Sequence, residues 1–214
     1  MDSCRLYIIT PSELGPLDQF ADKLECVLAA GDVSCLQLRL KGCDDDTLET
    51  AINVLKPLCH ERDVAFILND RPDLAASGRC DGVHIGSEDA SYKQARAVLP
   101  PDCVVGVTCN GSYHRAMEAA ERGADYVAFG AFYDSVTKKL DKTISRKILL
   151  DWSTSTTVPC VAIGGITIDN CISLVSAGAD FLAVCAGVWQ HPAGPAQAVK
   201  EFNNIFKANK KTKS

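Results

Sequence analysis

The tripeptide Gly-Ala-Asp occurs twice in this chain, each time before an aromatic residue and an apolar run: Gly123-Ala124-Asp125-Tyr126 and Gly178-Ala179-Asp180-Phe181. In each copy the glycine is placed to end a helix, and the residues after the aspartate have the composition of a short buried strand. The same helix-to-strand turn therefore recurs along the chain, and such a recurrence predicts a repetitive architecture.

Strand-like and helix-like segments alternate along the chain. Eight apolar runs have the length and composition of strands, at residues 6–9, 35–39, 65–68, 82–85, 104–108, 126–129, 160–163 and 181–184. The segment after each run is helical in pattern; for example, Leu48, Ile52 and Leu55 have the spacing of one buried helix face. Alternation of strands and helices predicts a parallel sheet.

A closed barrel and an open, doubly wound sheet both fit this alternation, and two further observations favour the barrel. The first strand ends at Ile9-Thr10-Pro11, without the G-x-G-x-x-G that a dinucleotide-binding sheet has at this point. Eight strand-helix units within 214 residues also match a compact barrel. We therefore predict an α/β protein with a single (β/α)8 (TIM) barrel over residues 1–206 and a basic, frayed tail over residues 207–214.

Composition excludes several classes of function. The formal net charge is -5 and the pI is about 5.4, which gives no basic surface for nucleic acid or anionic lipid. No apolar run approaches the roughly 18 residues of a membrane span, and the N-terminus does not resemble a signal peptide, so we expect a cytoplasmic protein without a membrane partner. The eleven cysteines are scattered without a C-x-x-C pair, so we expect most of them to be small buried residues.

The second predicted strand has donor side chains at every other position. Residues 36–41 read L-Q-L-R-L-K, so Gln37, Arg39 and Lys41 share one face and leucines occupy the other. In a barrel the leucine face packs against the helices, and the donor face would line the interior near the mouth, where it could bind a multiply charged anion. The alternative is an exposed edge strand, but a closed barrel has no edge.

Carboxylates follow the third and fourth predicted strands. Asp70 comes directly after Asn69 at the end of the third strand, and Asp89 lies in the segment after the fourth. Neighbouring strand ends meet at the barrel mouth, so the pair could bind Mg2+, which prefers carboxylate oxygens together with phosphate and water. Each aspartate alone could instead cap a helix. We expect His84 to point into the barrel, where a histidine is more often a hydrogen-bonded core residue than a catalyst.

The segments after the last three strands suit phosphate. Residues 135–138 read Ser-Val-Thr-Lys, which could close over a phosphate but could also form an ordinary polar surface loop. Residues 164 and 165 are both glycine, and residues 185–187 read Cys-Ala-Gly. Small residues leave backbone N–H groups open where this fold usually binds phosphate, although a glycine can also serve only to form a turn.

Together these motifs resemble those of the thiamine-phosphate synthase family and its relative, the thiazole tautomerase. The Q-x-R-x-K strand, the Asn-Asp pair, the D-G-V-H-I-G-S-E-D run, the G-A-D-Y-V turn, the S-V-T-K segment and the A-I-G-G-I turn occur in the family's order over nearly the whole barrel. The resemblance implies an enzyme that joins hydroxymethylpyrimidine diphosphate to a thiazole phosphate. In the family, pyrophosphate leaves first, and the thiazole nitrogen captures the pyrimidine carbocation.

The resemblance also implies roles for individual residues. The diphosphate would be held by Gln37, Arg39, Lys41, Asn69 and Lys138, and Mg2+ would be bound by Asp70 and Asp89. Thr108 matches a serine that lies against the pyrimidine and the leaving group, so the implied catalytic residues are Arg39, Lys138 and Thr108. The thiazole-phosphate pocket would be lined by Ser135, Thr137, Gly165, Cys185 and Ala186.

The chain departs from the family pattern at four places, one of which is the segment over residues 140–144, where a glycine that is common in the family is missing. Asp134 stands where proline is usual, Ala186 where serine is usual, and Asn110 where the synthase and the tautomerase alike tend to carry histidine. A tautomerase needs an acid or base at that turn, which asparagine cannot supply. Two alternatives remain beside a synthase: a tautomerase-like isomerase, and a barrel that binds a phosphorylated ligand without turning it over. The sequence does not determine the oligomeric state, and a homo-oligomer is one of the possible states.

Overall fold

The computed structural model describes residues 4–86, 92–134 and 144–209, and in these residues eight parallel strands close into one barrel. The strands are β1 (Arg5–Ile9), β2 (Cys35–Leu38), β3 (Ala65–Asn69), β4 (Gly82–Ile85), β5 (Val104–Asn110), β6 (Tyr126–Gly130), β7 (Cys160–Ile163) and β8 (Phe181–Val184). Neighbours pair in sequence order, and β1 pairs with β8 to close the ring. The predicted barrel is confirmed, and each strand lies within two residues of its predicted ends.

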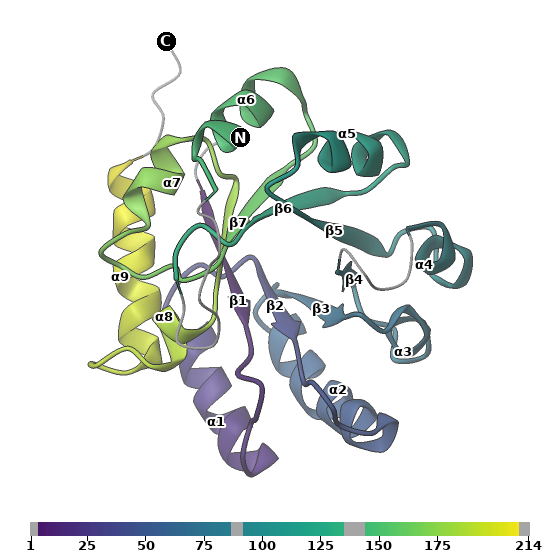
Figure 1. The fold of residues 1–214 in the computed structure, drawn as a ribbon. Helices are drawn as coiled ribbons and strands as arrows, with labels where there is room; N and C mark the ends of the chain where they lie inside the picture. Colours follow the sequence, from purple (N-terminus) through teal and green to yellow (C-terminus); the bar gives the residue numbers. More distant parts are fainter. Residues whose placement is uncertain (1–3, 87–91, 135–143, 210–214) are drawn as a thin grey trace.

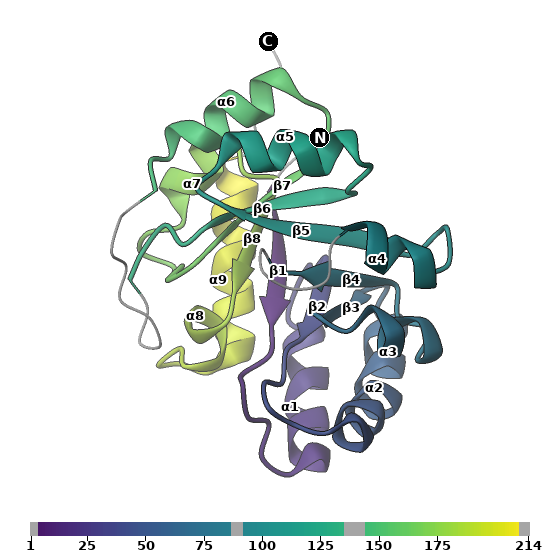
Figure 2. The same ribbon diagram turned by 45° about the vertical axis from the view of Figure 1, so that its right-hand side comes forward.

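Helices surround the barrel, as Figure 1 and Figure 2 show. In the described ranges they are α1 (Leu17–Leu28), α2 (Asp45–His60), α3 (Pro72–Ser77), α4 (Tyr92–Val98), α5 (Tyr113–Glu121), α6 (Lys147–Ser155), α7 (Ile172–Ser176), α8 (Ala186–Trp189) and α9 (Pro195–Ala208). None of these helices has both the length and the apolar character needed to cross a membrane.

The strands bury both of their faces. Outward residues such as Leu6, Leu36 and Leu182 pack with the helices in one large core. Inward residues form a separate cluster inside the barrel: Tyr7, Ile9, Cys35, Ile67, Tyr126, Ala128, Val161 and Ala183. Fully burying one large apolar side chain contributes about 1.5–3 kcal/mol, so the larger outer core supplies most of the stability. The inner cluster fills the barrel directly below the mouth.

An aspartate clamp at the N-terminal ends of β4, β6 and β8 explains the repeated Gly-Ala-Asp turn. In each clamp the aspartate carboxylate accepts from the backbone N–H of a residue on the preceding strand, and the aspartate N–H donates to the carbonyl of that same residue. The pairs are Asp81 with Phe66, Asp125 with Val105 and Asp180 with Cys160, with carboxylate distances of 2.6, 2.7 and 2.8 Å. The repeat therefore marks a joint between consecutive strands, on the face away from the mouth.

The C-terminal helix α9 packs against α1, α8 and β1. Asn203 on this helix accepts from the Asp32 N–H at 2.8 Å and donates to the Asp32 carbonyl at 3.0 Å, which ties the helix to the turn before β2. The helix runs through Lys207 to Ala208 and buries Phe206 in its last turn, so the first two residues of the predicted tail are helical. Residues 210–214 of the predicted tail lie outside the described residues.

Candidate functional site

The C-terminal ends of the strands form one mouth of the barrel, and several predicted site residues lie there. Asn69 is the last residue of β3, Thr108 lies near the end of β5, and Arg39 and Cys185 directly follow β2 and β8. Because all eight strands are parallel, these residues reach the same end of the barrel.

Arg39 carries a positive charge into this mouth. Its backbone N–H donates to Thr10 Oγ1 at 2.9 Å, beside the end of β1, and the residue is half-buried. Burial, with a smaller contribution from the Arg39 charge, lowers the pKa of His84 to about 4. Burial raises the pKa of Cys185, and the Arg39 charge opposes that rise. The guanidinium therefore acts on residues of both β4 and the end of β8, across the mouth.

Asp70 presents a carboxylate that is held in place on both oxygens. Its backbone has a φ of 63°, in the left-handed region, and its N–H donates to the His84 carbonyl at 2.8 Å. Oδ2 accepts from Asn69 Nδ2 at 2.5 Å, and Oδ1 accepts from the Gly86 N–H at 3.1 Å. Helix α3 receives no side-chain cap at its first turn, so the alternative role of Asp70 as a helix cap is excluded. An ionised carboxylate has about four lone-pair sites, so each oxygen keeps one for a further partner.

The geometry fits a Mg2+ ion that takes few ligands from the protein. In residues 4–86, 92–134 and 144–209, no group of three or more His, Cys, Asp or Glu side chains could hold a metal ion. Mg2+ commonly keeps several waters and binds one or two carboxylates together with substrate phosphates. Asp70 offers one oriented carboxylate of that kind, and the second predicted ligand, Asp89, lies outside the described residues.

Directly below the mouth, five polar side chains form a hydrogen-bonded chain through the inner cluster. Gln37 Nε2 donates to Tyr7 Oη at 2.7 Å, and Tyr7 Oη lies 3.0 Å from Tyr126 Oη. His84 Nδ1 is 2.9 Å from Tyr126 Oη, and His84 Nε2 is 2.7 Å from Thr108 Oγ1. The expected inward direction of His84 is confirmed. The chain ends at Thr108, which is half-buried at the mouth.

The three donors predicted to share one face of the second strand end at three different depths. Gln37 is only 2% exposed and its amide is bonded to Tyr7, one layer below the mouth. Arg39 lies at the mouth. Strand β2 ends at Leu38, so Lys41 is exposed in the turn beyond it, where strand alternation no longer determines its direction. The structure thus brings Arg39 to the other mouth residues but sets Gln37 below it and Lys41 outside the strand.

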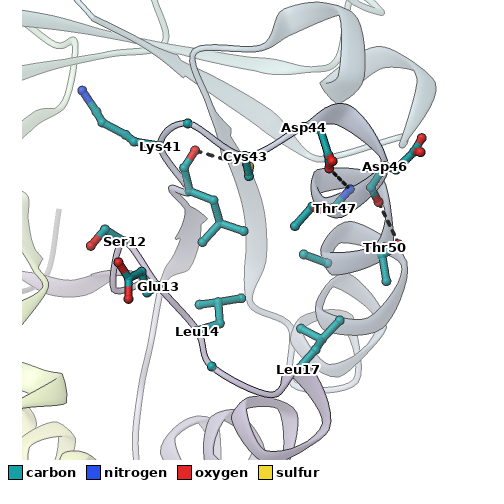
Figure 3. Close-up of a pocket in the computed structure, with 14 residues that line it drawn as sticks. Ser12, Glu13, Leu14, Leu17, Lys41, Cys43, Asp44, Asp46, Thr47 and Thr50 are labelled. Carbon is teal, nitrogen blue, oxygen red and sulfur yellow. Dashed lines mark hydrogen bonds between the residues drawn. The ribbon is translucent and has the colours of Figure 1, made fainter.

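A hollow of about 540 Å³ lies beside the mouth, between the segments that follow β1 and β2. Figure 3 shows Lys41 at its edge, with Nζ directed away from Asp44 and Thr47. Glu13, Asp44 and Asp46 also line it, and Asp44 caps α2 by accepting from the Thr47 N–H at 2.9 Å. With three carboxylates and one cation in its lining, the hollow is poorly suited to a diphosphate.

The segments after β6 and β7 approach each other backbone to backbone. The Phe132 and Tyr133 N–H groups donate to the carbonyls of Ile163 and Gly164, each at 3.1 Å. Gly165 has a φ of +63°, and a Cβ there would lie 2.3 Å from the Asp134 carbonyl oxygen. Glycine at this turn is therefore required by a left-handed backbone and by close packing, and not only by an open N–H group.

The remaining predicted residues lie at the end of β5 and in the segments that follow β6 and β8. Cys185 is half-buried, and its Sγ donates to the Thr10 carbonyl at 3.4 Å; Ala186 begins α8. Asp134 and Asn110 are both exposed, and Asn110 ends β5 with a φ of 51°. The predicted residues Ser135, Thr137 and Lys138 lie outside the described residues, as Asp89 does.

Tyr7, Tyr126 and Thr10 belong to this region although no sequence motif pointed to them. The two tyrosines lie at the inward positions of β1 and β6, and Thr10 Oγ1 receives the Arg39 N–H. Strict alternation along residues 6–9 and 126–129 would have placed the tyrosines inside, where a hydroxyl needs a partner. No sequence pattern would have shown that these partners are each other.

Comparisons relate the chain to known proteins. A family model described as thiamine monophosphate synthase matches residues 6–188. The chain is 56% identical over 207 residues to the thiamine-phosphate synthase of Rhodospirillum centenum (strain ATCC 51521 / SW), covering 97% of this chain and 100% of that protein. It is 49% identical over 209 residues to the thiamine-phosphate synthase of Hyphomonas neptunium (strain ATCC 15444), covering 95% and 94%. A solved thiamine phosphate pyrophosphorylase from Pyrococcus furiosus matches with a TM-score of 0.83 and 28% identity, over 95% of this chain and 96% of that chain.

Proposed function

Because this chain belongs to the thiamine monophosphate synthase family, we propose that it is a transferase that makes thiamine phosphate. It joins hydroxymethylpyrimidine diphosphate to a thiazole phosphate and releases pyrophosphate. The observation that carries the proposal is that the Arg39 charge and the oriented Asp70 carboxylate occur at one mouth. A diphosphate leaving group requires both a cation and a metal ligand at the same place.

In the proposed reaction, the bond between the pyrimidine methylene carbon and the diphosphate oxygen breaks first, and both electrons leave with pyrophosphate. The thiazole nitrogen then donates its electron pair to the pyrimidine carbocation and forms the C–N bond. This chemistry needs stabilisation of the charge on the leaving group, and it needs no strong base at the reacting carbon. Arg39 would supply positive charge at the mouth, with Lys41 and Lys138 as the further cations.

The remaining diphosphate and metal contacts follow from the same placement. Asp70 and Asp89 would hold Mg2+, which when bound neutralises charge on the diphosphate. Asn69 would orient the Asp70 carboxylate through the amide that already bonds Oδ2. Gln37 lies one layer below, bonded to Tyr7, and its contact with the diphosphate stays a prediction.

The thiazole phosphate would bind at the segments after β6, β7 and β8, on Ser135, Thr137, Gly165, Cys185 and Ala186. Replacement of the family's serine by Ala186 leaves a backbone N–H at that position, which can still donate to phosphate. Asn110 offers no acid or base at the end of β5, which favours the synthase over a tautomerase. We also propose that the enzyme acts in the cytoplasm on these small molecules.

A single-turnover assay tests the activity and the metal together. Wild-type protein mixed with both substrates and Mg2+ is expected to release pyrophosphate and form thiamine phosphate. Asp70→Asn is expected to lose both the activity and its Mg2+ dependence, because an amide cannot neutralise the ion. Asp73→Asn is the matched control, since Asp73 is exposed and pairs only with Arg71 among the described side chains.

Two outcomes would contradict the proposal at different points. Equal turnover of the wild type in excess chelator would exclude the metal assignment. Binding of both substrates without any coupling product would leave a non-catalytic phosphate-binding barrel as the better description.

A further inference from the structure

The hydrogen-bonded chain inside the barrel has a direction. Gln37 Nε2 can only donate, so Tyr7 Oη accepts from it, and the Tyr7 hydrogen needs an acceptor of its own. Among the described side chains that acceptor is Tyr126 Oη, at 3.0 Å. The Tyr126 hydrogen then points to His84 Nδ1, at 2.9 Å. Run in the opposite direction, the chain would give Tyr7 two donors and leave its hydrogen without an acceptor in the part of the molecule that the structure describes.

Packing leaves little freedom for another arrangement. The side chains of Gln37, Tyr7, Tyr126 and His84 belong to residues that are 2, 2, 7 and 6% exposed. The imidazole stacks on the Tyr126 ring, with centroids 5.6 Å apart and planes 20° apart. Gly106 makes room for that ring, since a Cβ there would lie 1.9 Å from Tyr126 Cζ. An imidazolium at this buried site would also set its Nδ1–H against the Tyr126 donor, so the neutral ring is favoured.

A neutral imidazole whose Nδ1 accepts must carry its hydrogen on Nε2. That hydrogen faces Thr108 Oγ1, at 2.7 Å. Because the Thr108 oxygen then accepts from His84, the Thr108 hydrogen is free to point outward into the mouth. We propose that His84, held as the Nε2–H tautomer by the chain from Gln37, is a positioning residue that makes the Thr108 hydroxyl a hydrogen-bond donor toward the bound ligand.

The role of the Thr108 hydroxyl toward the bound ligand rests on the proposed function. As the diphosphate departs, its oxygen gains negative charge, and a donor already aimed at the mouth stabilises that charge more than it stabilises the substrate. A substitution that reverses or breaks the hydrogen bonds between Gln37 and Thr108 should therefore lower kcat more than it changes KM. The tautomer itself does not depend on which ligand binds.

Nitrogen NMR of the ligand-free protein, with histidine labelled by 15N, tests the tautomer directly. The chain has four histidines, and His84→Asn identifies the signals of His84 by their loss. We expect Nδ1 to resonate as a nitrogen without hydrogen and Nε2 as a nitrogen with it. Tyr126→Phe removes the donor to Nδ1 and should shift His84 toward the Nδ1–H form; this second variant assigns the signals if His84→Asn does not fold. An Nδ1–H tautomer in the wild type would overturn the proposal.

A double-mutant cycle tests the link to Thr108. Tyr126→Phe should lower kcat by about two- to tenfold, the range for one neutral hydrogen bond, with a smaller change in KM. In a Thr108→Val background the same substitution should have no further effect, since no hydroxyl remains to be oriented. Tyr92→Phe is the matched control, because among the described residues the Tyr92 hydroxyl contacts the Gly123 carbonyl and Arg96, and neither belongs to the network.

The outcomes separate the two proposals. An equal loss from Tyr126→Phe in both backgrounds would overturn the positioning role, since the effect would then not pass through Thr108. If the wild type forms no thiamine phosphate, the proposed function fails, and the NMR result still decides whether His84 has the stated tautomer.

Discussion

Two charged residues at the barrel mouth, Arg39 and Asp70, are held in place by hydrogen bonds to their neighbours. Arg39 donates its backbone N–H to Thr10, and its charge acts on His84 in β4 and on Cys185 just after β8. Asp70 has a left-handed backbone and a carboxylate that is bonded on both oxygens. Side chains restrained in this way would need little rearrangement to bind a charged group, and a small rearrangement favours tight binding.

We predict that Arg39→Ala weakens pyrophosphate binding about ten- to a hundredfold. A hydrogen bond to a charged group contributes about 1.5–3 kcal/mol, and the Arg39 charge acts on His84 and Cys185 at the mouth. Isothermal titration with pyrophosphate and Mg2+ measures the change. Arg122→Ala, which removes an exposed arginine on the outer surface, should leave the affinity as it is. Unchanged affinity in Arg39→Ala would remove Arg39 from the diphosphate site.

The pKa of His84 gives a second prediction, on stability. In the folded protein this pKa is lowered to about 4, below the value near 6.5 of an unfolded chain. Above pH ~6.5 the ring is neutral in both states and costs nothing. As the pH falls toward 4, the unfolded state gains a proton that the folded state does not, so the folded state loses up to about 3 kcal/mol of stability.

Urea unfolding between pH 7.5 and 4 measures this effect. His84→Gln should show a flatter loss of stability across that range than the wild type, whatever its stability at pH 7.5. His114→Gln, at an exposed histidine on α5, should follow the wild-type curve. Parallel curves for the wild type and His84→Gln would show that His84 is not the group that titrates.

At the level of elements, the aspartate clamps join each even strand from β4 onward to the strand before it. In each clamp the aspartate carboxylate accepts from the backbone N–H of the partner residue, and the aspartate N–H donates to the carbonyl of that residue, as for Asp180 with Cys160. The clamps lie at the end of the barrel opposite the mouth, where a TIM barrel concentrates stability rather than chemistry.

We predict that Asp180→Ala destabilises the protein by about 1.5–3 kcal/mol without altering ligand affinity. The substitution removes a charge-assisted acceptor and leaves the Cys160 N–H without its partner. Asp151→Ala is the matched control, because among the described residues the Asp151 carboxylate pairs with Lys147 alone, in an exposed contact, and its loss should cost less than about 1 kcal/mol. Denaturant midpoints compare the two, and equal losses would mean that the clamp contributes no more than a surface ion pair.

The whole molecule buries most of its thiols. Of the eleven cysteines, which are free in the structure, Cys26 is exposed, Cys43 and Cys185 are half-buried, and the other eight are buried. Burial raises the pKa of several of them, for example that of Cys59 to about 12. A buried thiol with a raised pKa reacts slowly, because the thiolate is the reactive form.

We predict that a thiol reagent labels native protein at Cys26 first and at the eight buried cysteines only on global unfolding. Mass spectrometry of labelled peptides over time, with and without urea, measures the two phases. Cys26→Ser should remove the fast phase and leave the slow phase unchanged. Rapid labelling of Cys59 or Cys160 in native protein would indicate local opening of the barrel wall.

The strand and helix pattern of the sequence was enough to predict the architecture and to predict which side chains of a strand point toward the same face. Alternation of strand and helix patterns predicted a parallel sheet, the missing G-x-G-x-x-G and the eight units favoured a barrel, and the recurrent Gly-Ala-Asp turn marked two of its clamps. The period of two in residues 36–41 predicted one shared donor face; in the structure Gln37 contacts Tyr7 inside the barrel, and Arg39 follows the strand beside Thr10. These properties are local, because they depend on backbone geometry and on whether neighbouring residues are apolar.

Two properties of the inward side chains depend on the folded chain: how far below the mouth each one lies, and which side chain it bonds. Alternation cannot say how far down the barrel an inward residue lies or where a strand ends, so it did not separate buried Gln37 from exposed Lys41. Tyr7 and Tyr126 meet across 119 positions of sequence, because closure of β1 to β8 brings opposite walls of the barrel together. The direction of the hydrogen bonds at Thr108 follows from that closure, since each hydroxyl takes its orientation from a partner that the local sequence does not contain.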